Sequence, residues 1–159
     1  MSLFTIWIDA DSCPSLVRNH AIKIAYKLKL NIILVANKNI HCETDFPYEM
    51  KICSAQKDAA DDYILENVTN NDLVITRDIV FASKLVQKNI TSINDRGTVF
   101  NTENIPKLLS ERNFNLQLAE IGLVKHFNNG YNKKMFSLFA NTFDREISRL
   151  LRNYKRLCP

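Results

Sequence analysis

Residues 3–11 have the sequence LFTIWIDAD, in which a mostly apolar run leads directly into two aspartates. Such a run, rich in β-branched and aromatic residues, is typical of a strand buried on both faces of a sheet. After Pro14 the apolar residues recur at helical spacing, and residues 31–36 form a second apolar run. The first 36 residues therefore predict a β-α-β unit with parallel strands and a right-handed crossover.

The remaining chain continues this alternation of strands and helices. The pattern predicts a weak strand near residues 49–53, stronger strands at 73–76 and 90–93, and helices after each of the first two. Thr102 is expected to cap a further helix, and the last helix carries an aromatic stripe that indicates core or partner packing. We therefore expect an α/β fold with a doubly wound, mostly parallel sheet.

Length and composition indicate one compact domain. The chain has 159 residues, of which 46% are hydrophobic and 24% charged, with only three glycines and four prolines. The first apolar run is too short for a signal-peptide core, and no other run approaches membrane length. We expect a cytoplasmic protein that does not enter a membrane.

The four cysteines are expected to be free thiols. Cys13, Cys42, Cys53 and Cys158 lie far apart and form no C-x-x-C pair, so neither a zinc motif nor a disulfide framework is indicated. Cys13 has no histidine nearby to activate it, which favours a small buried thiol over a nucleophile.

The net charge of +4 is concentrated near the C-terminus, where residues 132–159 contain seven Lys and Arg against two acids. A basic helix of this kind can contact an anionic polymer such as nucleic acid. A solvated helix face is the commoner meaning of such a run, and on charge alone we favour it.

Acidic residues follow two of the predicted strands and open the helix between them. They are Asp9 and Asp11 after the first strand, Asp78 after the strand at 73–76, and Asp58, Asp61 and Asp62 at the helix. The carboxyl ends of parallel strands share one edge of the sheet, where ligands bind in open α/β folds. Residues three and four apart on a helix share a face. We therefore expect most of these acids to converge.

A convergent carboxylate cluster predicts a divalent cation, because burial and mutual repulsion penalise the charged acids. The absence of histidine from these segments favours Mg²⁺ or Mn²⁺ over zinc. Structural roles are alternatives for some members: Asp11 as an acid favoured by a helix dipole, Asp58 as a helix N-cap and Asp62 as a surface acid. Asp9 and Asp78 directly follow apolar strands and have no routine structural task.

Several segments together resemble the YaiI/YqxD family of uncharacterised bacterial proteins, in order and over nearly the whole chain. These segments are residues 6–14, 34–37, 58–61, 72–79, 94–97 and 102–105. The chain departs from the family pattern in its C-terminal third, where Asn113 replaces an aspartate, Met135 and Phe136 replace an Asp-Arg pair, and residues 125–130 replace a Gly-Gly-Pro loop.

The family is similar to the PIN-like superfamily, which includes metal-dependent ribonucleases and flap-type nucleases. The resemblance implies a single PIN-like domain over residues 1–159, with a three-layer α/β/α architecture and extra C-terminal helices. It carries the PIN-like metal-binding and catalytic acids onto Asp9, Asp61 and Asp78. Asp11 and Asp58 match further acids of the narrower family and are expected to support the metal.

The leading hypothesis is a Mg²⁺- or Mn²⁺-dependent nuclease that acts on RNA or structured nucleic acid. Asn37, Thr76, Arg77 and Arg96 are candidates for orienting the substrate phosphate. Two alternatives stay open. Asp9-Ala10-Asp11 resembles the D-x-D start of haloacid-dehalogenase-type phosphatases, with Asp9 as the nucleophile, and a non-catalytic module that binds RNA or protein would need the same residues. The apolar face of the last helix is covered either within the domain or in a homodimer.

Overall fold

The computed structural model describes residues 2–123 and 130–158. Within these residues the chain forms a five-stranded parallel sheet of order β3-β2-β1-β4-β5. The strands are β1 (Thr5–Asp9), β2 (Asn31–Ala36), β3 (Glu49–Ile52), β4 (Leu73–Ile75) and β5 (Thr91–Ile93). Each strand expected from the sequence is present, and the sheet is parallel throughout.

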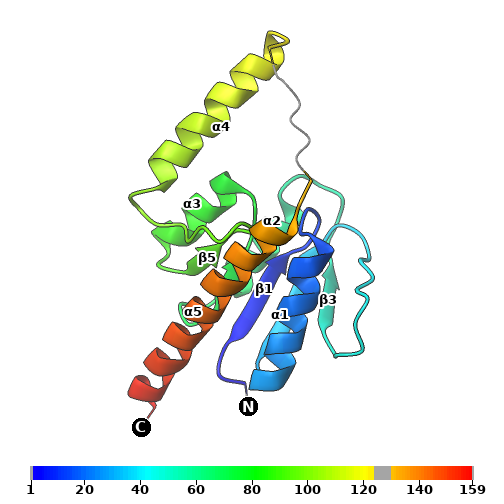
Figure 1. Cartoon of the computed structure of the whole chain (residues 1–159), viewed down its shortest axis with the longest axis vertical. Coiled ribbons are helices and arrows are strands. Elements are labelled where there is room, and N and C mark those ends of the chain that lie inside the picture. Colours follow the sequence, from blue (N-terminus) through cyan, green and yellow to red (C-terminus); the bar gives the residue numbers. More distant parts are fainter. Residues whose placement is uncertain (1, 124–129, 159) are drawn as a thin grey trace.

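Helices connect the strands and cover both faces of the sheet (Figure 1). They are α1 (Ser15–Leu28), α2 (Ala59–Asn67), α3 (Ile79–Gln87), α4 (Ile105–Glu120) and α5 (Lys133–Leu157). Helices α1 and α5 share a hydrophobic cluster with one face of the sheet, and α2 and α3 share a second cluster with the other face. The predicted three-layer α/β/α architecture with extra C-terminal helices is confirmed.

Strand β1 shows why the sheet needs helices on both sides. Ile6 and Ile8 are fully buried in the cluster formed with α1 and α5, while Trp7 between them packs in the cluster formed with α2 and α3. Side chains alternate between the faces of a strand, so a run that is apolar at every position must be covered twice. The segment LFTIWIDAD thus places β1 at the centre of the sheet.

The aromatic stripe of α5 belongs to the core. Phe139, Phe143, Ile147 and Leu150 are buried in the cluster that α5 shares with α1 and the sheet. Phe139 and Phe143 stack with their ring centroids 5.4 Å apart. This apolar face is therefore covered within the domain.

Helix α4 differs from α5, because it packs on α3 through its first turns and then extends away from the sheet (Figure 1). The prediction that Thr102 caps this helix is wrong, since the N-cap is Asn104. The Asn101 carboxamide accepts the amides of Glu103 and Asn104, and Asn104 accepts the amide of Asn101. Asparagine side chains compete well for local backbone groups, and here they set the start of the helix. Residues 125–129 of the expected loop departure lie outside the described residues.

Candidate functional site

The predicted acids lie at the point where the strand order of the sheet reverses. The chain adds β2 and β3 on one side of β1, then returns to add β4 and β5 on the other side. Asp9 ends β1 and Asp78 follows β4, so both flank this switch point, where open α/β sheets bind ligands. A pocket of about 280 Å³ lies there, and its lining includes all five predicted metal ligands: Asp9, Asp11, Asp58, Asp61 and Asp78.

Asp9 is the most central of these acids. Its Oδ2 accepts a hydrogen bond of 2.8 Å from the Thr76 hydroxyl. The pKa of Asp9 is raised from 3.8 to about 6: burial is the main cause, the Thr76 hydrogen bond opposes it, and the charges of Asp11 and Asp78 add to it. The Asp9 carboxylate is thus held in an environment that opposes its charge.

Asp61 lies in the first turn of α2 and faces the same acids. The pKa of Asp61 is raised from 3.8 to about 7, mainly by burial and then by the charges of Asp9, Asp78, Asp58 and Asp62, in that order of importance. Asp9 and Asp78 come from the ends of β1 and β4, so the fold brings three distant segments into electrostatic contact. The predicted convergence of Asp9, Asp61 and Asp78 is present in the structure.

Asp58 occupies the N-cap position of α2 in an unusual backbone conformation. Its φ of 62° and ψ of 8° are left-handed, and its side chain makes no capping hydrogen bond. The backbone carbonyl of Asp58 accepts the amide of Asp62 at 2.8 Å, so the helix begins without help from the carboxylate. Left-handed conformations are uncommon outside glycine, although aspartate tolerates them better than most residues. Asp58 lines the acid pocket.

Asp78 does have a structural task, so the expectation that it has none is wrong. Its Oδ1 accepts the amide of Phe81 at 3.1 Å and caps α3. The first turn of a helix has unpaired amides, and an acid that follows a strand and precedes a helix is well placed to accept one.

Asp11 connects the turn after β1 to the segment after β2 beside the pocket. Both of its carboxylate oxygens accept the backbone amide of Asn37, at 3.2 and 3.1 Å. Asn37 directly follows β2, so this contact fixes the turn after β1 against the end of its neighbouring strand. Asn37 also lines the acid pocket, as expected for a residue that could contact a substrate there.

Thr76 lies too deep to orient a substrate phosphate. It is only 2% exposed, and its hydroxyl donates to Asp9 while accepting the amide of Asp78 at 3.1 Å. One buried hydroxyl therefore links Asp9 at the end of β1 with Asp78 after β4. The structure makes Thr76 a positioning residue for two acids.

Arg77 and Arg96 do not line the acid pocket. Arg77 donates from Nε to the buried carboxylate of Asp95 at 2.6 Å, and both arginines line a neighbouring pocket with Asp95. Asp95 was not predicted as a site residue, because an acid in a turn gives no signal of its burial. Lys57, which lines the acid pocket, was also missed, since a lysine before a helix resembles any surface residue.

The donor set in the pocket fits a hard divalent cation in its chemistry, because it offers carboxylate oxygens and no histidine or cysteine. As the side chains stand, no three Asp, Glu, His or Cys residues within residues 2–123 and 130–158 are grouped to hold one ion together. Mg²⁺ is usually bound through one or two carboxylates and several waters, so a compact cage is not required.

Cys13 lies beside the site but is not equipped as a nucleophile. It is buried, and burial raises the pKa of its thiol to about 12. Cys13, Cys42, Cys53 and Cys158 are all free thiols, as predicted. Among the described helices, none is long and apolar enough to cross a membrane.

Comparisons with known proteins identify relatives over nearly the whole chain. A UPF0178 protein of Treponema denticola is 41% identical and covers 92% of this chain and 94% of its own length. A UPF0178 protein of Treponema pallidum is 39% identical over 96% of this chain and 86% of its own length, and one of Marinomonas sp. is 35% identical over 92% and 99%. No solved structure matches the chain significantly. The family model described as "Uncharacterized BCR, YaiI/YqxD family" matches residues 7–149. This chain belongs to the YaiI/YqxD family.

Proposed function

We propose that the acid pocket binds Mg²⁺ or Mn²⁺ and that the protein hydrolyses phosphodiester bonds in RNA or structured nucleic acid. One observation carries the proposal: Asp9, Asp61 and Asp78, from three separate elements, line one pocket, where the charge of Asp78 helps to raise the pKa of both Asp9 and Asp61. Several carboxylates facing one pocket are costly unless a cation neutralises them.

Asp9, Asp61 and Asp78 would hold the cation, with Asp11 and Asp58 in support. Asp9 uses Oδ2 for Thr76 and Asp78 uses Oδ1 for Phe81, so each carboxylate has a second oxygen to offer. These two hydrogen bonds also fix the orientation of the carboxylates. A bound cation would supply charge neutralisation at the phosphate and activation of water.

The chain's own residues would position the substrate around this centre. Lys57 at the pocket rim would attract a phosphate, and Asn37 would offer a carboxamide to it. Thr76 and Asp11 hold the loops that carry the acids. The resemblance of the family to PIN-like nucleases agrees with this arrangement, while the names of the relatives state no activity.

The test is to incubate purified protein with single-stranded RNA, structured RNA, flap DNA and p-nitrophenyl phosphate, with Mn²⁺ or with a chelator. At least one polynucleotide should be cleaved only with metal, and the small ester should not be. Asp9→Asn, Asp61→Asn and Asp78→Asn should each reduce cleavage by roughly 100-fold or more, with non-additive effects because the acids act as a unit. Asp62→Asn is the matched control, because Asp62 is exposed on the same helix and does not line the pocket.

Other outcomes identify the alternatives. Hydrolysis of the small ester with a phosphorylated Asp9 would indicate a haloacid-dehalogenase-type phosphatase. A shift of RNA on a gel without cleavage of any substrate would indicate a binding module. Undiminished metal-dependent cleavage by an Asp9→Asn/Asp78→Asn double variant would refute the assignment of these acids.

A further inference from the structure

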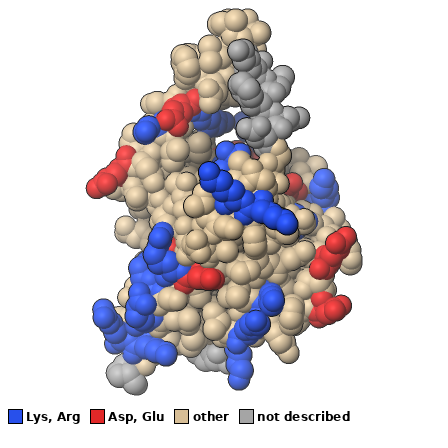
Figure 2. All heavy atoms as spheres, viewed as in Figure 1, with Lys and Arg blue, Asp and Glu red and all other residues tan. Residues whose placement is uncertain are grey.

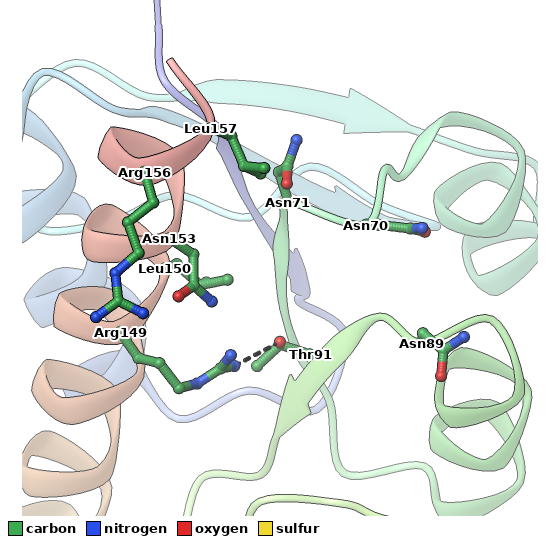
Figure 3. A pocket seen from close by; sticks show the side chains of 9 residues that line it. All are labelled: Asn70, Asn71, Asn89, Thr91, Arg149, Leu150, Asn153, Arg156 and Leu157. Carbon is green, nitrogen blue, oxygen red and sulfur yellow. Dashed lines mark hydrogen bonds between the residues drawn. The ribbon is translucent and has the colours of Figure 1, made fainter. Parts of the chain in front are cut away.

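A second polar pocket lies at the amino ends of the strands, whereas the acids lie at their carboxyl ends (Figure 3). Among its lining residues, Asn70 and Asn71 precede β4 and Asn89 precedes β5. The pocket has a volume of about 330 Å³, within the range of small-molecule sites. Its other wall is the last part of α5, which contributes Arg149 and Arg156.

The lining of this pocket is basic and rich in hydrogen-bonding groups. It contains the guanidinium groups of Arg149 and Arg156, four asparagine carboxamides and the Thr91 hydroxyl, and no carboxylate is among its described lining residues. The second half of α5 also bears Arg145, Arg152 and Lys155. Figure 2 shows Lys and Arg side chains gathered towards the C-terminal end of this helix. Guanidinium groups bind phosphate with two parallel hydrogen bonds and suit such a lining.

Hydrogen bonds fix one part of each wall of the pocket. Arg149 donates to Glu146 at 2.8 Å through Nε and to the Thr91 hydroxyl at 2.9 Å through Nη2, which fixes it across α5 and β5. Asp72 accepts the Thr69 amide at 2.9 Å and closes the turn that carries Asn70 and Asn71. Arg149 and this turn are thus ordered before a ligand binds, which lowers the entropy lost there on binding.

Arg156 must supply most of the attraction for an anion. Helix α3 ends at Gln87 beside these amino ends and α5 ends at Leu157, which lines the pocket, so carbonyl ends of helices approach the site and disfavour negative charge. Arg149 forms an ion pair with Glu146, which neutralises part of its charge. Arg156 lines the pocket and makes no ion pair with any residue of the described chain, and in Figure 3 its side chain runs along α5 towards Arg149.

We propose that this pocket binds a phosphate ester, carried by a nucleotide or by a polynucleotide, with Arg156 and Arg149 at the phosphate and the asparagines at the sugar or base. Carboxamides offer both donors and acceptors, which suit the hydroxyl and base edges of a nucleotide. The site is separate from the acid pocket and does not depend on a metal or on the nuclease proposal.

The test measures binding by calorimetry in the presence of a chelator, which prevents metal at the acid pocket from capturing phosphate. The probes are inorganic phosphate, adenosine 5′-monophosphate, adenosine and a single-stranded oligoribonucleotide. The monophosphate should bind more tightly than adenosine, and Arg156→Gln should weaken its binding about ten-fold or more. Arg152→Gln is the matched control, because Arg152 is exposed on the same helix and does not line the pocket. It should change binding less than about two-fold at moderate salt.

The results also identify the source of the phosphate. Binding of the monophosphate points to a nucleotide, and Arg156-dependent binding of the oligonucleotide alone points to a polynucleotide. If Arg152→Gln and Arg156→Gln weaken binding of the phosphate-bearing probes equally, the attraction is diffuse along the helix and the proposed binding site is overturned. Failure of the wild-type protein to bind any phosphate-bearing probe would also overturn it. Circular dichroism of each variant verifies the fold.

Discussion

Two aspartates at opposite ends of the parallel strands have very different surroundings. Asp72, just before β4, is 4% exposed and accepts hydrogen bonds from the Thr5 amide at 2.8 Å, the Trp7 indole at 3.1 Å and the Thr69 amide at 2.9 Å. Asp9, at the end of β1, accepts one hydrogen bond from Thr76 and faces further acids. Burial stabilises a carboxylate only where donors replace its water.

Asp72 has the contacts of a structural residue, whereas Asp9 and Asp61 have those of a candidate functional site. Asp72 joins β1 to the turn before β4 and has all the partners that a structural acid needs. Asp9 and Asp61 retain a cost that the fold does not relieve, as their raised pKa values show. Proteins often tolerate such costs where binding or catalysis requires them. Replacing Asp72 should therefore lower the free energy of unfolding, whereas replacing Asp9 should raise it.

The largest change in the free energy of unfolding is expected for Asp72. Asp72→Ala should lower the free energy of unfolding by about 3 kcal/mol or more, because three buried donors lose their acceptor. Asp72→Asn should lose less, since its amide oxygen can still accept. Urea titrations of the two variants measure this, and a loss below about 1 kcal/mol for Asp72→Ala would contradict the structural role.

Asp78 tests whether one residue serves both the fold and the site. Asp78→Ala should cost about 1 kcal/mol by removing the cap of α3, whereas Asp78→Asn should keep the cap. Both variants should lose most of the stabilisation that millimolar Mn²⁺ gives the wild-type protein, since both remove a ligand charge. If Mn²⁺ raises the thermal midpoint of both variants as much as that of the wild-type protein, Asp78 does not hold the metal.

The effect expected at Asp9 is also small, and its sign is reversed. With a chelator present, Asp9→Asn should raise the free energy of unfolding at pH 8 by an amount on the order of 1 kcal/mol. The pKa of Asp9 is 3.8 ordinarily and about 6 in the fold, so between these values the native state binds more protons than the unfolded state. The stability contributed by the protonated acid is complete below pH 3.8 and is lost as the pH rises through about 6.

The pH series provides the control for this prediction. The advantage of Asp9→Asn should be nearly absent at about pH 4, where the wild-type acid is largely protonated in the native state, and should grow up to about pH 7. Thermal unfolding at several pH values measures the difference. A constant difference between the two proteins across this range would show that charge repulsion at Asp9 is not its source.

Much of the fold could be predicted because its signals are local. Apolar runs and helical spacing identified all five strands and the alternation of strands and helices along the chain, most clearly at β1, which is buried on both faces. The start of α4 was misplaced because Asn101 and Asn104 competed successfully with Thr102 for the local backbone amides. The basic charge of α5 was visible in the sequence, but the pocket that it forms with the asparagines was not.

By itself, the sequence determined that acids would gather at one edge of a parallel sheet, because the carboxyl ends of parallel strands meet there. Only the tertiary structure decided which acids are paired and which are not. The donors of Asp72 come from β1 as well as from its own turn, and Thr5 and Thr76 lie 67 positions from the aspartates that they contact. Arg77 similarly pairs with Asp95, 18 positions away. A carboxylate has the same local sequence signal whether it is satisfied or repelled, because its distant neighbours set its free energy.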